Sequence, residues 1–435
     1  MKLNYRRTLL LGLGFFGISI IWSIYNSYIP PFLRQYELPW WLVGFVMTFD
    51  NIAGIVIQPY VGQLSDRTRT RLGRRMPYIL VGAPLAALFW MLIPIIHLNM
   101  PHVTPTLALL TGVIILMNIA MAIFRTPTVA LMPDITPSPL RSKANGIINL
   151  MGGLGTTLAF LGGAFLYKMY PGLPFWVGGV IMLVAEIILI LVIREPGEYY
   201  SPADAPADPR PGLFDTLLQT LRDVGQVIRS PEKSALFIFL AIFTWFVGYN
   251  AIETFWTSYG REVLYASQIA AGRMTADQAV AKASGMLTYI SAVFLIFALP
   301  AGFIATRFGR KRTIMTGLAI LMTMWLGIYF VHADLYVIAT LVLSGIGWAL
   351  ININSLPIVV DLVPEEKVGS YTGLYYFFSM AAAITAPPLV GALMDLLSVQ
   401  VMFLFTPLFM LLAFLCMCGV RRSEPAVAPD TATSR

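Results

Sequence analysis

Long stretches of this chain carry no Asp, Glu, Lys or Arg. A helix that crosses a bilayer needs about 20 predominantly apolar residues. Seven charge-free runs reach that length: Thr8–Leu33, Ala144–Tyr167, Ala283–Thr306, Thr313–Ala333, Leu335–Val360, Val368–Met394 and Leu396–Val420. The run 76–124 suffices for two helices, and three more runs contain at least one acid: Trp40–Leu64, Phe175–Ile193 and Ser234–Val263. The sequence therefore predicts an all-α membrane protein with twelve transmembrane helices and both termini on one side.

Composition excludes the main alternatives. The chain is 57% hydrophobic and 12% charged, whereas a soluble domain carries about 25% charged residues. A soluble enzyme, a disordered chain and a coiled coil are all incompatible with these values. No G-x-x-x-x-G-K phosphate loop is present, so direct use of ATP and a bound cofactor are not expected. Cys416 and Cys418 lie in the last run and predict neither a disulfide nor a metal site.

The basic residues predict the orientation. Of 29 Lys and Arg residues, 23 lie at the termini or in connections on the same side of the membrane as the termini, and five lie in the opposite loops. The positive-inside rule then places both termini in the cytoplasm of a multi-pass protein of the cell (inner) membrane. The net charge of +7 thus reflects topology, and no nucleic-acid partner is expected. The first run is too long for a signal-peptide core and is expected to remain as a helix.

Internal repetition predicts two parallel six-helix halves. Asp134, Pro137 and Gly146 recur 227 positions later, and two further segments recur at similar offsets. We expect an N-terminal half at 1–195, a cytoplasmic linker at 196–232, a C-terminal half at 233–420 and a cytoplasmic tail at 421–435. The linker contains a Pro-, Ala- and Asp-rich segment, 198–212. An amphipathic segment follows it, either lying on the membrane surface or packed as a plain linker helix.

One loop carries a resemblance to a known family. The G-x-L-x-D-R-x-x-x-R-x-G-R-R pattern at 62–75 and its counterpart GFIATRFGRK at 302–311 resemble the loops of the major facilitator superfamily. Within it, QPYVG (58–62), SDR (65–67) and RLGRRMPYI (71–79) are similar to the signature of sucrose transporters, which adjoin the glycoside-pentoside-hexuronide:cation symporters. The resemblance implies that the first, fourth, seventh and tenth helices line a central cavity.

These loops supply the candidates for gating. We expect Asp134, at the end of the fourth helix, to pair with Arg74 or Arg75 in a cluster that latches the two halves in one conformation. A passive role as a topology signal is the alternative. The candidate gating residues are Gly62, Asp66, Arg67, Arg71, Gly73, Arg74, Arg75, Asp134, Arg307, Arg310 and Asp361.

Charged side chains at membrane depth are candidates for function because they are costly there. Five stand out: Asp50, Arg125, Glu186, Glu253 and Asp395. The helices that the resemblance places around the cavity put Arg125 and Glu253 first. Arg125 either donates to sugar hydroxyls or forms a structural pair with Asp50. For Glu186 a structural hydrogen bond to a neighbouring helix is favoured.

One stripe of the seventh helix is expected to carry Tyr249, Glu253 and Trp256 or Thr257. It suggests sugar chemistry, because an aromatic ring stacks on the C–H face of a sugar while carboxylates and amides bond its hydroxyls. An interfacial anchoring role explains each aromatic residue individually. The candidate substrate-binding residues are Trp22, Asn26, Asn118, Arg125, Tyr249, Asn250, Glu253, Trp256, Asn352, Asn354 and Tyr375.

Together these features predict a monomeric secondary transporter that works by alternating access and takes up a disaccharide or glycoside with a proton, or with sodium. Membrane lipid is the other expected partner. Asp50 and Glu253 are the candidates for proton coupling. The ion sites of the relatives do not transfer, because their acids correspond to Asn118 in one group and to Gly54 and Gln58 in another. An uncoupled facilitator, a multidrug or metabolite exporter, and a non-transporting pigment- or lipid-binding protein remain alternatives.

Overall fold

The computed structural model describes residues 3–196, 215–363 and 367–421, and their architecture is helical. Within these ranges, twelve spans are long and apolar enough to cross a membrane, which confirms the predicted fold class. The first six comprise α1 (Tyr5–Arg34), α2 (Trp40–Met47), α3 (Phe49–Arg67), α4 (Met76–Asn99), α5 (Thr104–Ile135), α6 (Arg141–Met169) and α7 (Leu173–Val192), with α2 and α3 forming one span. The second six comprise α9 (Ser234–Tyr259), α11 (Ala276–Phe308), α12 (Arg310–Phe330), α13 (Asp334–Val360), α14 (Val368–Leu396) and α15 (Met402–Gly419).

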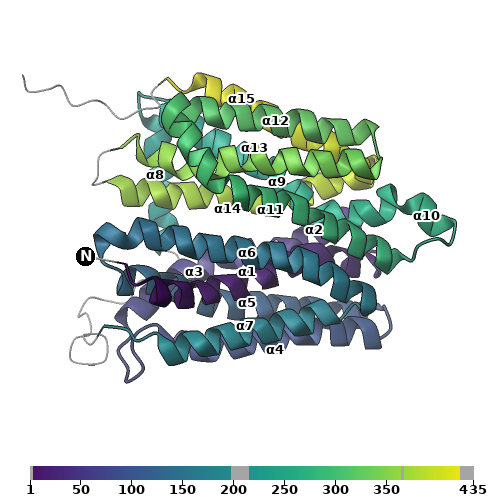
Figure 1. Cartoon of the computed structure of the whole chain (residues 1–435), viewed down its shortest axis with the longest axis horizontal. Coiled ribbons are helices and arrows are strands. Elements are labelled where there is room, and N and C mark those ends of the chain that lie inside the picture. Colours follow the sequence, from purple (N-terminus) through teal and green to yellow (C-terminus); the bar gives the residue numbers. More distant parts are fainter. Residues whose placement is uncertain (1–2, 197–214, 364–366, 422–435) are drawn as a thin grey trace, which may run out of the picture.

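The two sets of six form two bundles that lie against each other. Figure 1 shows α1 and α3–α7 in one bundle and α9 and α11–α15 in the other. The internal repeat is visible in the helix bounds, because both ends of α6 recur 227 positions later as the ends of α14. Short helices complete the chain: 3-10 turns at Ser138–Leu140 and Val399–Val401, a π-helix at Gly260–Leu264, and α10 (Ala266–Ala270).

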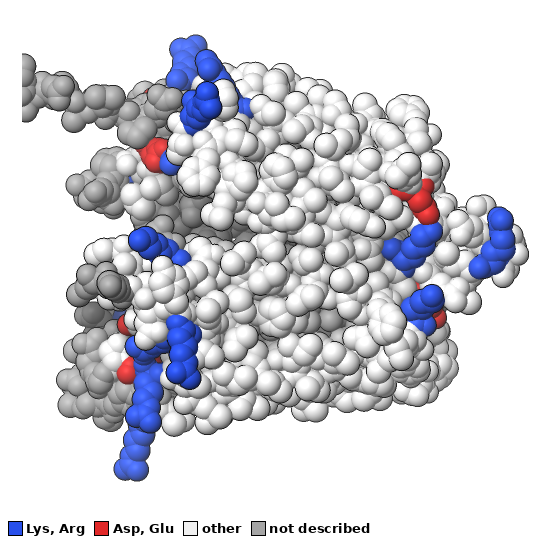
Figure 2. Space-filling view, in the orientation of Figure 1, with Lys and Arg blue, Asp and Glu red and all other residues white. Residues whose placement is uncertain are grey.

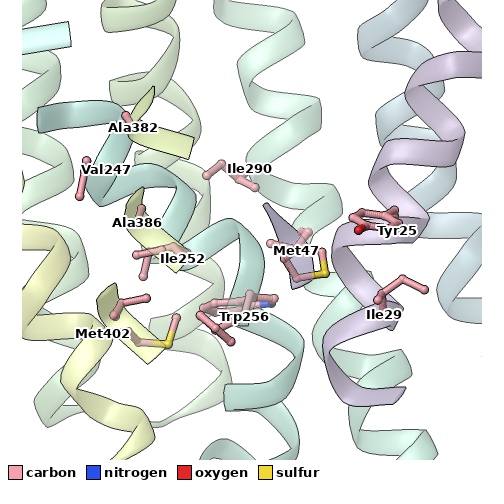
Figure 3. Packing of buried hydrophobic residues seen from close by; sticks show 14 of the residues in the cluster. Tyr25, Ile29, Met47, Val247, Ile252, Trp256, Ile290, Ala382, Ala386 and Met402 are labelled. Carbon is pink, nitrogen blue, oxygen red and sulfur yellow. The ribbon is translucent and has the colours of Figure 1, made fainter. Parts of the chain in front are cut away.

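A continuous apolar core joins the bundles. Its side chains come from helices of both halves, and Figure 3 shows Met47 of α2 between Tyr25 of α1 and Trp256 of α9. Lipid tails are as apolar as these side chains, so close packing holds the bundles together more than the hydrophobic effect does.

The two halves pack tightly at one end and separate at the other. We call the end at which α1 begins and α15 ends the basic end, because Lys and Arg gather there (Figure 2). Far from it, a Cβ at Gly44 of α2 would lie 2.3 Å from the Pro387 carbonyl oxygen of α14. At the basic end, a groove of about 630 Å³ lies between α3 of the first half and the start of α14 of the second. The space between the halves is therefore closed at the opposite end and widens toward the basic end.

The connection between the halves includes α8 (Asp215–Arg229), which lies at the basic end. It packs against α3 of one half and α14 of the other, and Val227 is buried while Leu221 and Ile228 remain exposed. Its residues Gln219, Thr220 and Asp223 line the groove together with Gln63 of α3 and the start of α14, and the Asp223 carboxylate accepts from the Ser370 hydroxyl at 2.8 Å. The predicted Pro-rich segment 198–212 and the tail beyond residue 421 lie outside the described residues.

Candidate functional site

A cavity of about 270 Å³ lies between the halves. Its lining comes from α1, the α2–α3 span, α5, α9 and α14: Trp22, Asn26, Met47, Asp50, Asn51, Arg125, Asn250, Glu253, Thr254, Ala383 and Pro387. Seven of these eleven side chains are polar or charged. Three of the five charges predicted at membrane depth meet here, although they are far apart in the sequence.

A break in the second span places Asp50 in the cavity. The helix is interrupted at Thr48, whose hydroxyl donates to the Phe45 carbonyl oxygen at 2.7 Å. Asp50 follows in the first turn of α3, where the helix dipole favours a carboxylate. Its Oδ1 accepts from the backbone N–H of Asn51 at 2.7 Å and from the Asn51 amide at 2.6 Å. Asp50 is thus held by its own segment, with its second oxygen free of described donors.

Arg125 brings a cation to the same cavity from α5. Its guanidinium carbon lies 5.8 Å from the centre of the Trp22 ring, which is within the range of a cation–π contact. Among the described side chains, no nitrogen–oxygen distance of 4 Å or less joins Arg125 to Asp50. The two charges therefore share a cavity without forming a direct ion pair, and the guanidinium donors can serve a ligand.

Glu253 links the halves across the cavity. The Asn26 amide of α1 donates to Glu253 Oε1 of α9 at 3.1 Å. One turn further along α9, the Thr257 hydroxyl donates to the Ser27 carbonyl oxygen at 2.6 Å. The neighbouring Asn250 also lines the cavity and donates to its own helix, to the Phe246 carbonyl oxygen at 2.7 Å. Glu253 is thus both a cavity carboxylate and an acceptor from the other half.

The other aromatic residues predicted for the site do not line this cavity. Trp256 is fully buried, and its indole N–H donates to the Ala283 carbonyl oxygen at 2.7 Å. Tyr249 stacks on Trp348 with ring centres 3.8 Å apart, and the Tyr375 hydroxyl lies 3.0 Å from that of Ser355. Of the predicted stripe on α9, Glu253 reaches the cavity, while Trp256 packs in the core.

Three predicted amides also lie away from the cavity. Asn118 is buried and donates to the Tyr25 hydroxyl at 3.5 Å. Asn354 is buried and donates to the Leu350 carbonyl oxygen of its own helix at 2.9 Å. Asn352 is half-buried on the same helix. The cavity instead contains Asn51 and Thr254, which sequence reasoning passed over although each is adjacent to a predicted acid.

The arginine cluster after α3 forms a dense network. Arg74 pairs with Asp134, and Arg75 pairs with both Asp66 and Asp134, the last at 2.9 Å. Glu195, which the sequence did not single out, accepts from the backbone N–H groups of Arg74 at 2.9 Å and Arg75 at 2.8 Å. The partners named here all belong to the first half, so these contacts tie α3, α4 and α5 together.

The remaining gating candidates surround this network or its repeat. Gly73 has φ +104°, which favours glycine, while Gly62 faces the Thr126 methyl group. In the second half Arg310 pairs with Asp361 and donates to the Pro357 carbonyl oxygen at 3.1 Å. Arg71 and Arg307 are exposed and Arg67 is half-buried. The repeat thus reproduces an arginine–aspartate pair in each half.

Two further charges lie outside the cavity. Glu186 of α7 is 1% exposed, and neither carboxyl oxygen accepts a hydrogen bond from a described residue. The favoured bond to a neighbouring helix is therefore not formed within the described chain. Asp395, near the end of α14, bonds to α2 of the other half.

Known proteins resemble this chain in sequence and in fold. The chain is 30% identical over 194 residues to the general alpha-glucoside permease of Schizosaccharomyces pombe, covering 42% of this chain and 35% of that protein. It is 30% identical over 171 residues to proton-associated sugar transporter A of Homo sapiens (37% and 22%). It is 24% identical over 238 residues to a sucrose transport protein of Oryza sativa subsp. japonica (47% and 48%). The matched segments thus span less than half of each relative.

Solved structures show the same fold at low identity. The nucleoside transporter NupG matches with a TM-score of 0.70 at 15% identity, covering 97% of this chain and 100% of that one. A bacterial homologue of the human lysosomal transporter Spinster, in an inward-facing and occupied conformation, matches with a TM-score of 0.69 at 14% identity over 97% and 98%. The family model for MFS/sugar transport proteins matches residues 10–370. This multi-pass membrane protein therefore belongs to the MFS/sugar transport protein family, whose members are membrane transporters rather than enzymes.

Proposed function

We propose that this protein is a secondary transporter that takes up a disaccharide or a related glycoside together with a proton, by alternating access. The observation that carries the proposal is the polar cavity between the halves, in which Arg125, Asp50 and Glu253 come together. A cavity between two repeated bundles is where transporters of this architecture bind their substrates. The basic end is assigned to the cytoplasm by the positive-inside rule.

The lining favours a hydroxyl-rich ligand over a lipophilic one. Arg125 supplies several donors, Asn26 and Asn250 supply amides, and Glu253 supplies acceptors. Trp22 adds a ring face on which the C–H face of a sugar can stack. A cavity for lipophilic drugs would be mostly apolar, whereas seven of the eleven lining residues here are polar or charged.

Two carboxylates make proton coupling the favoured mode of energisation. An acid that faces a closed cavity on one side of the cycle and water on the other can bind and release a proton between them. Asp50 and Glu253 both face the cavity, and Glu253 also accepts from Asn26 of the other half. Its proton occupancy would therefore alter a contact between the halves. The names of the relatives, a glucoside permease, a proton-associated sugar transporter and a sucrose transport protein, support the same assignment.

Sugar counterflow in proteoliposomes tests the proposal directly. Vesicles loaded with unlabelled sugar should accumulate the labelled sugar transiently, and sugar addition should make the outside more alkaline. A panel of maltose, sucrose, glucose and a nucleoside at two pH values separates the substrate class from the coupling ion. Counterflow without alkalinisation would indicate a facilitator. Absence of counterflow for every sugar would refute the proposal.

Two acids of the chain provide a matched pair of variants. Glu253→Gln removes the charge of a cavity carboxylate, so sugar-driven proton uptake should fall by about tenfold or more. Glu186→Gln makes the same chemical change at a buried site outside the cavity and should leave transport near its original rate. Equal effects of the two substitutions would remove Glu253 from the proposed site.

A further inference from the structure

One contact closes the end of the cavity that faces away from the basic end. The carboxylate of Asp395, in the last turn of α14, accepts from the backbone N–H of Trp40 at 2.9 Å and from that of Trp41 at 3.0 Å. These are the first two residues of α2, whose N-cap residue Pro39 provides no side-chain cap. The free N–H groups at the start of α2 are thus satisfied by an acid from the other half of the molecule.

The surrounding packing brings α2 and α14 close together at this contact. A Cβ at Gly391, one turn before Asp395, would lie 2.4 Å from the Trp40 carbonyl oxygen. The Arg34 guanidinium lies 4.2 Å from the centre of the Trp40 ring and adds positive charge at the same place. Asp395 itself is exposed, so water can replace its partners when the halves part. A contact of this kind can form and break at small cost.

Helix α2 leads directly into the cavity. α2 is eight residues long and ends at the break at Thr48, after which Asp50 and Asn51 line the cavity. Met47, at the end of α2, also lines it. A displacement of α2 about Thr48 would therefore move the cavity wall. The contact at one end of α2 and the polar site at the other are joined by one short rigid element.

The equivalent place in the repeat is built differently. By the 227-residue offset, Asp395 corresponds to Lys168 near the end of α6. The helix that faces α6 across the halves is α11, and its start is capped by its own residues. The Thr275 hydroxyl accepts from the Gln278 backbone N–H, and the Gln278 side-chain oxygen accepts from the Thr275 backbone N–H. Capping of a helix by an acid of the other half is therefore a feature of one of the two related contacts: the start of α2 is capped by Asp395, and the start of α11 by its own residues.

We propose that Asp395 is a conformational latch: by capping α2 from the opposite half, it holds the transporter closed at the end away from the basic end. The proposal rests on alternating access between the halves but not on the identity of the sugar or the ion. Loss of the charge should shift the resting population toward molecules open at that end. The protein should stay folded, because α2 keeps its apolar packing.

Distance measurements between the halves test this latch without any substrate. Spin labels at Met100→Cys in the first half and Leu335→Cys in the second, in a background with Cys416→Ala and Cys418→Ala, place one probe on each half. Both probes lie at the end away from the basic end. Both sites are exposed, at 42% and 80%. In lipid nanodiscs, Asp395→Asn should increase the population of longer distances about threefold, the size expected for a charge at a helix N-terminus. Lys168→Asn, at the equivalent place, should leave the distance distribution unchanged.

A second substitution separates latching from simple capping. Pro39→Ser supplies an N-cap side chain from the same half, so Asp395→Asn with Pro39→Ser restores the cap without restoring the link between halves. The latch predicts that this double variant folds with normal thermal stability and still shows the longer distances. A distribution that returns to that of the parent would show that Asp395 only caps α2. An unchanged distribution in Asp395→Asn itself would also overturn the proposal, whether or not sugar transport is found.

Discussion

Two interfaces between the halves, α2 against α14 and α6 against α11, are related by the internal repeat, and we call them seams. They are held together in different ways. Where α2 meets α14, backbone lies against backbone, because Gly44 and Gly391 would place a Cβ within 2.3 and 2.4 Å of carbonyl oxygens. Where α6 meets α11, side chains intervene: a Cβ at Gly285 would lie 3.2 Å from the Ala164 methyl group, and one at Gly153 would lie 2.7 Å from a methyl group of Leu295. One seam is closed by backbone contact and the other by side chains.

The polar contacts differ in the same sense. Asp395 caps α2 from the other half through two bonds of about ideal length. Across the second seam, the Tyr167 hydroxyl donates to Asp277 at 3.5 Å, which is at the limit of a hydrogen bond. A structure of two similar halves can therefore place its main control on one seam and leave the other as a pivot. Four substitutions, one of them a matched control, test this difference.

The largest effect is expected from filling the tight seam. Gly391→Ala places a methyl group against the Trp40 backbone, which cannot move aside as a flexible side chain can. Overpacking of this kind costs about 1–3 kcal/mol, so the closed state should lose population and the distance between labels at Met100 and Leu335 should increase. Double electron–electron resonance in nanodiscs measures the distance between the two labels.

Gly285→Ala is the matched control, since it adds the same methyl group to the second seam. The neighbouring Ala164 methyl group requires a shift of only a few tenths of an ångström. The distance distribution should therefore stay close to that of the parent protein. An equal opening in both variants would show that the two seams are equally tight.

An intermediate effect on stability, without any effect on conformation, is expected at the self-capped helix. Thr275→Ala removes the cap of α11 and should lower the free energy of unfolding by about 1 kcal/mol. Because Thr275 and Gln278 belong to the same half, the distances between the halves should not change. A thermal unfolding midpoint measured beside the distance distribution checks both parts. A shift toward the open state would mean that the cap also supports the seam.

The fold was largely predictable from the sequence because the membrane allows few alternatives. Charge-free runs of sufficient length must be helices, since a lipid-exposed backbone has no other way to satisfy its hydrogen bonds. The repeat of Asp134 as Asp361 then predicted two related halves, and the bounds of α6 and α14 agree with that offset. The break at Thr48 was not predicted, because nothing in the local sequence prevents a continuous helix from Trp40 to Arg67.

The lining of the cavity was anticipated for its charged residues and much less for its aromatic ones. Asp50, Arg125 and Glu253 face the cavity, because a charge within the membrane needs a polar neighbour wherever it lies. Trp256 shares a helical stripe with Glu253 but turns into the core, where α11 offers its indole an acceptor. A helical stripe is wide enough to face both a cavity and a neighbouring helix, so periodicity alone does not separate the two.

The smallest effect is expected where the second seam carries its long hydrogen bond. Tyr167→Phe removes the hydroxyl that donates to Asp277 at 3.5 Å but keeps the ring, which stacks on Tyr28 with centres 4.3 Å apart. Loss of a weak, partly exposed bond should cost no more than about 0.5 kcal/mol. This changes the ratio of the two conformations by less than about threefold. The distance distribution should then be nearly that of the parent. A shift as large as that of Asp395→Asn would show that this seam also holds a latch, and the assignment of control to the contact between α2 and α14 would fall.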